Sequence, residues 1–303
     1  MENKAGMQYA WIRQLLTVLR QALVLSLCSV CIILLTSQIT THEPLSGMYL
    51  GQELPGTSPE RFARGIIPDD LHSVPVFSAD GKTVYYKSMD GESIMVASEK
   101  GNKWSFPTPL FIRDEVKNSD DPCLSPSGDQ LFFSSYNKEA NRDYIYCCEL
   151  GKDGLSAPEQ PPGHVNQLDL HWQFCLAGNG NIYFASNGNI YCSEMQSGQY
   201  LDPYKLGEAV NTELSECTPY VSPDESMLIF ARSINGKPDL FLSRKDSNGH
   251  WLSAKPLNAG INTEHHEMCP RMTDDGKYFF FISSREGLFS AYWVDASVLD
   301  LQK

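Results

Sequence analysis

The sequence has little positive charge and no familiar catalytic fingerprint. Its 24 lysines and arginines stand against 37 aspartates and glutamates, which gives the 303 residues a formal net charge of −13. An acidic surface repels phosphate backbones, and no dense basic cluster offsets that average, so we expect no nucleic-acid partner. The sequence also lacks a G-x-S-x-G elbow, a Walker loop, an H-E-x-x-H motif and a dinucleotide fingerprint. We therefore expect no cofactor.

Cysteine pairs at metal-binding spacing are missing from the body of the chain. Seven cysteines follow residue 40, an odd number, and they are spread widely without C-x-x-C spacing. A closed disulfide framework needs an even set, and a zinc site needs short pairs. We therefore expect most of these cysteines to be small buried residues in strands.

A long apolar run is lacking except near the N-terminus. Lys4, Arg13 and Arg20 precede an apolar run at 22–35. A membrane span usually needs about 20 residues, so the run would have to be extended by residues 15–19 to cross a bilayer. Basic residues before the run predict a cytoplasmic N-terminus and an exported remainder.

The N-terminal region therefore divides into an export element and a linker. We expect residues 1–37 to be an export signal or a membrane anchor, and no clean small-x-small cleavage site decides between the two. If the segment is not cleaved, residues 15–37 anchor the protein to the membrane. Residues 38–58 are polar and contain glycine and proline, which predicts a linker. The expected location is periplasmic or otherwise extracytoplasmic.

One phrase recurs five times after residue 59. It begins at Pro75, Pro122, Gln173, Pro219 and Pro270, and its period of about 49 residues is typical of propeller blades. Each phrase joins a short apolar run, a turn similar to Ser-Pro-Asp-Gly and an alternating aromatic strand, which is the pattern of a hairpin. A third strand follows, and then a weaker fourth that contains proline, as expected at a sheet edge.

These repeats predict an all-β fold, a five-bladed β-propeller of four-stranded antiparallel blades preceded by an N-terminal hydrophobic helix. Six blades are the alternative. The propeller covers residues 59–303, with repeats near 69–117, 118–168, 169–214, 215–265 and 266–303. Only ten residues follow Trp293, so the last repeat lacks an outer strand. We expect residues 58–67 to supply that strand and close the ring.

The repeats resemble the TolB-type, WD-like propeller family. Its consensus runs through Asn-Thr, Glu, Pro, Ser-Pro-Asp-Gly-Lys, an aromatic strand and Asp-Ile-Tyr, and the fourth and fifth repeats match it best. The third repeat departs from it, with Gln173 in place of proline. The resemblance covers the chain after residue 59, and we expect no counterpart of the N-terminal α/β domain of TolB. It implies the propeller fold and leaves function open, because propellers host many activities.

Two classes of loop meet on one face of such a ring, and they carry most of the unusual polar residues. We call it the funnel face: the turns that lead into each inner strand and the loops between the second and third strands. Its mixture of charges and imidazoles suits a polar ligand, a metal ion or a peptide end. The candidate ligand-binding residues are His72, Asp121, His171, Trp172, Glu216, Arg232, Glu267 and Arg285.

The two glutamates have a second interpretation. Glu216 and Glu267 both lie three residues before the proline of their repeats. A ring has one reaction centre, whereas a repeated glutamate suits a structural acceptor for turn N–H groups. A metal site would need His266 together with His72 or His171 from other blades.

The leading hypothesis is an exported, non-catalytic binding or scaffold protein that recognises a protein, a peptide or an envelope component on the funnel face. The first alternative is a glycosidase-like hydrolase, in which Asp121, Glu216 and Glu267 are the candidate carboxylates. The second is a metal-dependent lyase or lactonase that uses His72 and His171.

Overall fold

Short antiparallel strands form five sheets in the computed structural model, which describes residues 45–302 except for 90, 113–115, 117, 153, 171, 172 and 259. The first sheet contains β2 (Val76–Phe77), β3 (Thr83–Tyr86), β4 (Met95–Lys100), β5 (Lys103–Trp104) and β6 (Thr108–Pro109), with β5 and β6 both paired to β4. The second contains β7 (Ser119–Leu124), β8 (Gln130–Asn137), β9 (Arg142–Gly151) and β10 (Gly154–Leu155).

In the remaining three sheets the strands are also hydrogen-bonded in an antiparallel arrangement. The third contains β11 (Cys175–Leu176), β12 (Ile182–Ser186), β13 (Asn189–Ser193) and β16 (Tyr204–Lys205), beside a small hairpin of β14 (Met195–Gln196) and β15 (Gln199–Tyr200). The fourth contains β17 (Ser215–Val221), β18 (Met227–Ile234), β19 (Lys237–Arg244) and β20 (Lys255–Pro256). The fifth contains β21 (Glu267–Met272), β22 (Tyr278–Ser283), β23 (Ser290–Asp295) and β1 (Glu60–Arg61). Short helical segments are α2 (Met48–Gly51), η1 (Val165–Gln167) and η2 (Ala296–Gln302).

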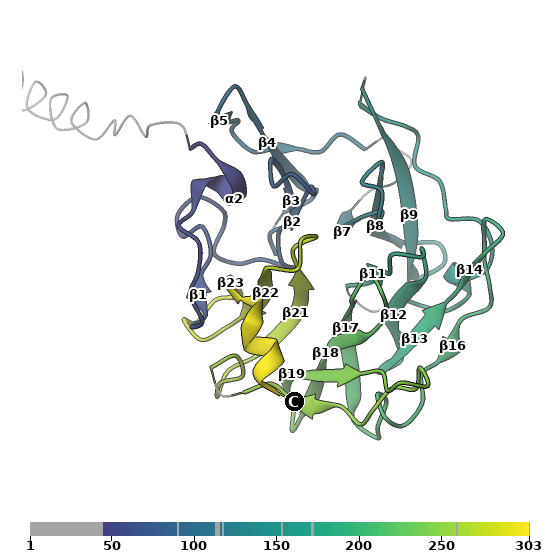
Figure 1. Cartoon of the computed structure of the whole chain (residues 1–303). Helices are drawn as coiled ribbons and strands as arrows, with labels where there is room; N and C mark the ends of the chain where they lie inside the picture. Colours follow the sequence, from purple (N-terminus) through teal and green to yellow (C-terminus); the bar gives the residue numbers. More distant parts are fainter. Residues whose placement is uncertain are drawn as a thin grey trace, which may run out of the picture. The chain divides into compact units, whose positions relative to one another are not determined.

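The N-terminal strand β1 closes the ring. It pairs antiparallel with β23, Glu60 opposite Trp293 and Arg61 opposite Tyr292, and the two lie side by side in Figure 1 although they come from opposite ends of the unit. The Phe62 N–H continues the pairing by donating to the Ala291 carbonyl at 2.8 Å. The prediction of five blades with an N-terminal closing strand is therefore confirmed, and the six-blade alternative is wrong.

Turn chemistry explains why each repeat begins with a hairpin. In the fourth blade, Ser222 Oγ donates to Asp224 at 2.6 Å and accepts from the Met227 N–H at 2.9 Å. Gly81 takes the positive φ of 66° that the tight turn requires in the first blade. Glu225 stands at the equivalent position of the fourth blade with φ of 55°, and Asn181, Tyr183 and Lys245 contact its carboxylate. The loss of glycine there is offset by these side-chain bonds.

A repeated asparagine connects the outer loop to the third strand of the same blade in blades three and four. The Asn211 side chain accepts from the Ile190 N–H at 2.7 Å and donates to the Ile190 carbonyl at 2.9 Å. Asn262 makes the same pair of bonds with Leu240. This explains the Asn-Thr element of the repeat, because the side chain acts as a short additional strand segment.

The core lies between neighbouring blades. Separate clusters of buried apolar residues fill the interfaces of blades one and two, two and three, and five and one, and one larger cluster joins blades three, four and five. The seven cysteines described are all free, and six are buried. The prediction that they serve as small core residues is confirmed.

The predicted linker over 38–58 is wrong from Leu45 onward. Tyr49 and Leu50 are only 5% and 3% exposed, and the Tyr49 ring packs edge-on against Phe77 with the centroids 5.1 Å apart. The Trp104 indole donates to the Gly47 carbonyl at 2.8 Å. Two apolar residues among glycines and prolines were enough to anchor the segment between blades one and five, and the compact unit accordingly begins at Leu45.

The predicted export element and N-terminal helix, residues 1–37, lie outside the described residues. Within the part of the chain that the structure describes, no helix is long and apolar enough to cross a membrane.

Candidate functional site

The inner strands β2, β7, β11, β17 and β21 place the candidate residues relative to the axis of the ring. The end of each strand that receives the chain from the preceding blade belongs to the funnel face. The other end leads into the hairpin turn, so the axis has a funnel end and a hairpin end. Six of the predicted residues are described by the structure and belong to the funnel end: His72, Asp121, Glu216, Arg232, Glu267 and Arg285.

Glu216 is enclosed by its own blade. Its side chain is fully buried and accepts from the Thr212 hydroxyl at 2.7 Å and from the Thr212 N–H at 3.2 Å. Arg232 Nε donates to the same carboxylate at 2.8 Å, and Arg232 Nη2 donates to the Val210 carbonyl at 2.8 Å. The glutamate and the arginine together fix the loop before the inner strand. This agrees with the interpretation of the repeated glutamate as a structural hydrogen-bond acceptor.

Glu267 repeats this arrangement in the fifth blade. Its side chain is also fully buried and accepts from the Thr263 hydroxyl at 2.7 Å, the Thr263 N–H at 3.0 Å and the Ser283 hydroxyl at 2.8 Å. Arg285 lies 3.5 Å from the carboxylate and donates to the Ile261 carbonyl at 2.7 Å. Four of the eight candidate residues are therefore engaged in two equivalent internal networks.

His72 and Asp121 do come together, in a cluster that also contains Asp120. His72 Nδ1 lies 3.0 Å from Asp120 Oδ1 and 3.6 Å from Asp121 Oδ1. Lys87 Nζ lies 3.3 Å from the other oxygen of Asp120, and the Ser134 hydroxyl donates to Asp121 at 3.2 Å. We call His72, Lys87, Asp120 and Asp121 the axial cluster. It joins blades one and two at the funnel end.

The charges of the axial cluster depend on one another. Burial lowers the pKa of His72, but the neighbouring carboxylates of Asp120 and Asp121 outweigh it and raise the pKa to about 10. Burial raises the pKa of Asp120, but His72 and Lys87 bring it below its usual value. Burial and the neighbouring Asp120 raise the pKa of Asp121. At neutral pH, His72 is therefore an imidazolium bound to at least one carboxylate.

The histidine and the two aspartates of the axial cluster also have the composition of a metal site. Ligand atoms of His72, Asp120 and Asp121 all lie within 4.8 Å of one another. A divalent cation would have to displace the His72 proton and the Lys87 ammonium, both of which already balance the carboxylate charge. His266 is not a member of this group, because its ring packs 6.0 Å from the Phe289 ring. The remaining candidates, His171 and Trp172, lie outside the described residues.

Three inner strands carry the same backbone irregularity, and one of the three positions, Asp121, belongs to the axial cluster. Asp121, Thr218 and Cys269, each directly before the blade's proline, have positive φ of 47°, 46° and 52°, and the strand register shifts at the same points. The Cys269 N–H donates to the Thr218 hydroxyl of the adjacent blade at 3.1 Å. Each bulge lies along its inner strand between the funnel end and the hairpin end.

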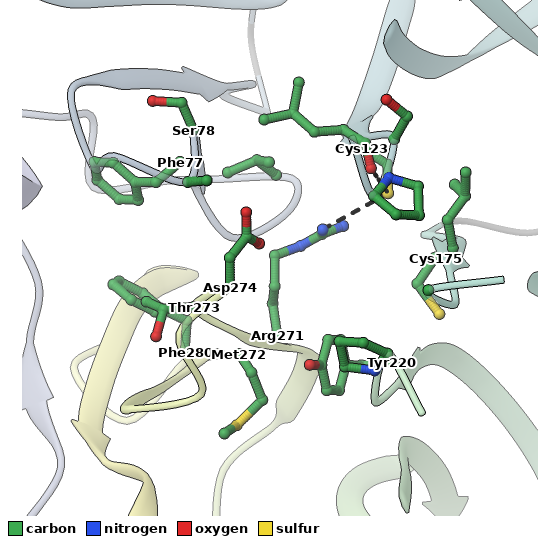
Figure 2. Close-up of a pocket in the computed structure, with 18 of the residues that line it drawn as sticks. Phe77, Ser78, Cys123, Cys175, Tyr220, Arg271, Met272, Thr273, Asp274 and Phe280 are labelled. Carbon is green, nitrogen blue, oxygen red and sulfur yellow. Dashed lines mark hydrogen bonds between the residues drawn. The ribbon is translucent and has the colours of Figure 1, made fainter. Parts of the chain in front are cut away.

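A cavity of about 420 Å³ lies at the hairpin end of the axis, where the sequence predicts no site (Figure 2). Arg271 extends across it, with Nη1 3.7 Å from Cys123 Sγ. Its Nε is buried without a hydrogen-bond partner. Among the described residues, no carboxylate forms an ion pair with the Arg271 guanidinium within 4.0 Å. We call this cavity the arginine cavity.

Arg271 is the charged member of a ring of equivalent positions. The register places it opposite Phe280, as Val76 is placed opposite Tyr85, Cys123 opposite Phe132, Cys175 opposite Tyr183 and Tyr220 opposite Ile229. Burial lowers the pKa of the Arg271 guanidinium, but Cys123, Cys175 and Tyr220 outweigh burial and raise the pKa above its usual value. Arg271 therefore stays charged. The break in the repeat was visible in the sequence, since only the fifth phrase has a charge after its proline.

Comparisons with known proteins support the fold. No family model matches the sequence, and no curated protein matches it. Among solved structures, putative TolB from Agrobacterium tumefaciens is 17% identical with a TM-score of 0.52, over 80% of this chain and 86% of that one. An endo-arabinase from Bacteroides thetaiotaomicron is 12% identical with a TM-score of 0.53, over 80% of this chain and 97% of that one. One neighbour is named as an enzyme and the other is not, so the shared fold does not select a function.

Proposed function

We propose that the chain is an exported, non-catalytic binding protein whose propeller recognises a protein, a peptide or an envelope component on the funnel face. Export is supported by the basic residues Lys4, Arg13 and Arg20 ahead of the apolar run at 22–35. We further propose that this segment is either cleaved or retained as the membrane anchor.

The observation that carries the proposal is the internal use of Glu216 and Glu267. A glycosidase needs two carboxyl groups that face a sugar from opposite sides. Both glutamates are fully buried, and each accepts hydrogen bonds from its own loop. Asp121 is the remaining carboxylate of the hydrolase alternative, and it is only 4% exposed. The geometry therefore favours recognition over hydrolysis.

The axial cluster provides the groups that a partner would contact. The side chains of His72 and Asp120 are 26% and 19% exposed, so both are partly open to solvent and held in place by each other. Polar groups fixed in advance lose little conformational entropy when a partner binds, and they reject partners of the wrong charge. A partner that covers the axial cluster would therefore be selected by its charge at the centre of the funnel face.

A metal-dependent lyase or lactonase is the second candidate. It is favoured by the single histidine and two aspartates whose ligand atoms lie within 4.8 Å of one another. In that case the carboxylates and the neutral imidazole of His72 would hold the cation, and Lys87 would have to move away.

The test compares the full chain with the double variant His72→Gln/Asp120→Asn. The control is Glu208→Gln, which also removes one carboxylate but at an exposed position. Each protein is assayed for capture of cross-linked partners from its native envelope and for turnover of glycosides and lactones, with and without added divalent cations. We expect no turnover, together with capture that the double variant loses and the control retains.

Metal-stimulated turnover that the double variant loses would establish the second candidate and contradict the proposal. Capture that survives in the double variant would place the binding surface away from the axial cluster.

A further inference from the structure

We propose that the arginine cavity is a binding site for a carboxylate attached to an apolar group, with the Arg271 guanidinium as its anchor. The site lies at the hairpin end of the axis, so it is independent of the funnel face and of the function proposed for it. The same chemistry is presented by a small organic acid and by the free C-terminus of a peptide.

The first argument is the unbalanced charge. Arg271 is charged and partly buried. Its Nε has no hydrogen-bond partner, and the hydrogen bond recorded for its side chain is the one that Nη1 donates to the Cys123 thiol. A thiol is a weak acceptor, and a guanidinium removed from water needs an anion or several strong acceptors. The equivalent positions of the other inner strands are occupied by apolar, thiol and phenol side chains, and Asp274 is the single carboxylate among the described lining residues. Asp274 forms no ion pair with Arg271 within 4.0 Å, so the guanidinium has no direct anionic partner among the described residues.

The second argument is the cavity in front of the guanidinium. Its volume of about 420 Å³ lies within the range of small-ligand pockets. Figure 2 shows the Arg271 side chain running through the middle of the pocket, between the side chains of Phe77 and Ser78 on one side and those of Cys123 and Cys175 on the other. A ligand that enters from the hairpin face can therefore reach the fork of Arg271 and still contact several blades.

The composition of the wall selects the ligand class. Apolar side chains such as Phe77, Met272 and Phe280 are interspersed with the hydroxyls of Ser78, Ser125 and Thr273. One guanidinium matches one carboxylate, since its planar fork can donate two parallel hydrogen bonds. A phosphate dianion would want further cations or a set of N–H donors, and the lining offers one arginine together with the carboxylate of Asp274. The apolar wall contributes most binding energy to a ligand that has a hydrophobic group attached to its carboxylate.

The test measures ligand-induced thermal stabilisation of the full chain. The probes are benzoate and hexanoate, with benzamide and hexanamide as neutral isosteres, and inorganic phosphate and sulfate as inorganic anions. A mixed-sequence hexapeptide library with free C-termini, beside the same library amidated, distinguishes a peptide end from a small acid. At 10 to 100 times the dissociation constant, we expect a carboxylate to raise the melting temperature by about 3–8 °C and the matching amide to have no effect.

Variants connect the stabilisation to Arg271. Arg271→Gln should weaken carboxylate binding by about 10- to 100-fold, as expected for the loss of a charge-assisted pair. Lys255→Gln removes the same charge from an exposed position of β20 and should leave binding unchanged. Arg271→Met should melt at or above the wild-type temperature without ligand, because it removes a partly buried charge that has no ion-pair partner among the described residues.

Three results would overturn the proposal. They are equal stabilisation by acids and amides, equal carboxylate binding by wild type and Arg271→Gln, and stabilisation by phosphate or sulfate without any by carboxylates. A lower melting temperature of Arg271→Met, together with no carboxylate effect on the wild type, would show that Arg271 has only a structural role.

Discussion

At the residue scale, the position of a side chain in the repeat separates structural roles from candidate binding roles. Asn211 and Asn262 occupy equivalent positions in the outer loops of blades three and four and make equivalent bonds to the third strand of the same blade. Glu216 and Glu267 behave in the same way with their threonines. Arg271 has no equivalent of the same type and faces the Cys123 thiol of another blade. His72 also faces another blade, although His171 stands at the equivalent place in the third repeat. Residues that break the repeat are therefore the ones to test for ligand contact.

The charge of His72 predicts a pH dependence of stability. Its pKa is raised from 6.5 to about 10 by Asp120 and Asp121, so the folded state binds the proton more tightly than the unfolded state. The resulting stabilisation is fully present below pH 6.5 and is lost as the pH rises through 10. The melting temperature of wild type minus that of His72→Gln should therefore be largest near pH 6 and should shrink toward pH 10. A difference that stays constant across this range would contradict the described ion pairs.

The buried glutamates predict a loss of stability. Glu216→Gln leaves the Arg232 guanidinium without its carboxylate, and breaking a buried pair by removing one partner costs about 3–5 kcal/mol. Glu267→Gln should cost less, because its closest bonds are to hydroxyls and an N–H and its arginine lies 3.5 Å away. Denaturant unfolding of both variants beside the exposed control Glu208→Gln measures the difference. If both variants keep wild-type stability and lose binding or turnover, the glutamates act on a ligand.

The sequence could nominate these residues but could not choose among their roles. The equal spacing of Glu216 and Glu267 before proline was visible, whereas the return of Thr212 and Thr263 onto the two carboxylates depends on the turn geometry. Arg271 is not among the residues predicted from the sequence. The break in the repeat at that position lies inside a strand, and only the ring arrangement brings it opposite Cys123.

At the element scale, strands with strong local patterns were predicted well and segments with weak patterns were not. Hairpin turns and aromatic strands are fixed by residues close in sequence, so the five repeats gave the five sheets. The segment from Leu45 to Gly51 has a few apolar residues without regular spacing, and its burial depends on a partner surface formed by blades one and five. No periodicity within the segment itself could reveal that surface.

The closing strand predicts a strong effect of a single phenylalanine. Phe62 is 2% exposed and packs against Phe280 and Trp293 of the fifth blade, with ring centroids about 5 Å apart. Phe62→Ala should destabilise the propeller by about 3–5 kcal/mol, as expected for a truncated core aromatic. Phe106→Ala is the matched control, since that ring is 93% exposed and should change the stability by less than about 0.5 kcal/mol. Equal unfolding free energies for the two variants would mean that β1 does not close the ring.

At the scale of the whole molecule, one ring offers two chemically different ends of the same axis. The funnel end carries the axial cluster of paired opposite charges, and the hairpin end carries a cavity in which Arg271 has no ion-pair partner among the described residues. The bulges at Thr218 and Cys269 lie between them, with a hydrogen bond that crosses from one blade to the next. A protein partner on the first end and a small acid or chain end at the second are therefore compatible, because neither set of contacts requires the other.

Site-specific photo-crosslinking in intact native cells tests the central claim, recognition of a partner on the funnel face, most directly. A photoreactive phenylalanine analogue replaces Tyr136, which is 41% exposed at the end of β8 on the funnel face, or Phe106, which is 93% exposed in the segment between β5 and β6 of the first blade. The predicted result is a discrete cross-linked partner from position 136 and none from position 106, with the adduct lost when His72→Gln/Asp120→Asn is introduced. An adduct from position 106 alone, or one from position 136 that persists in the double variant, would contradict recognition at the axial cluster.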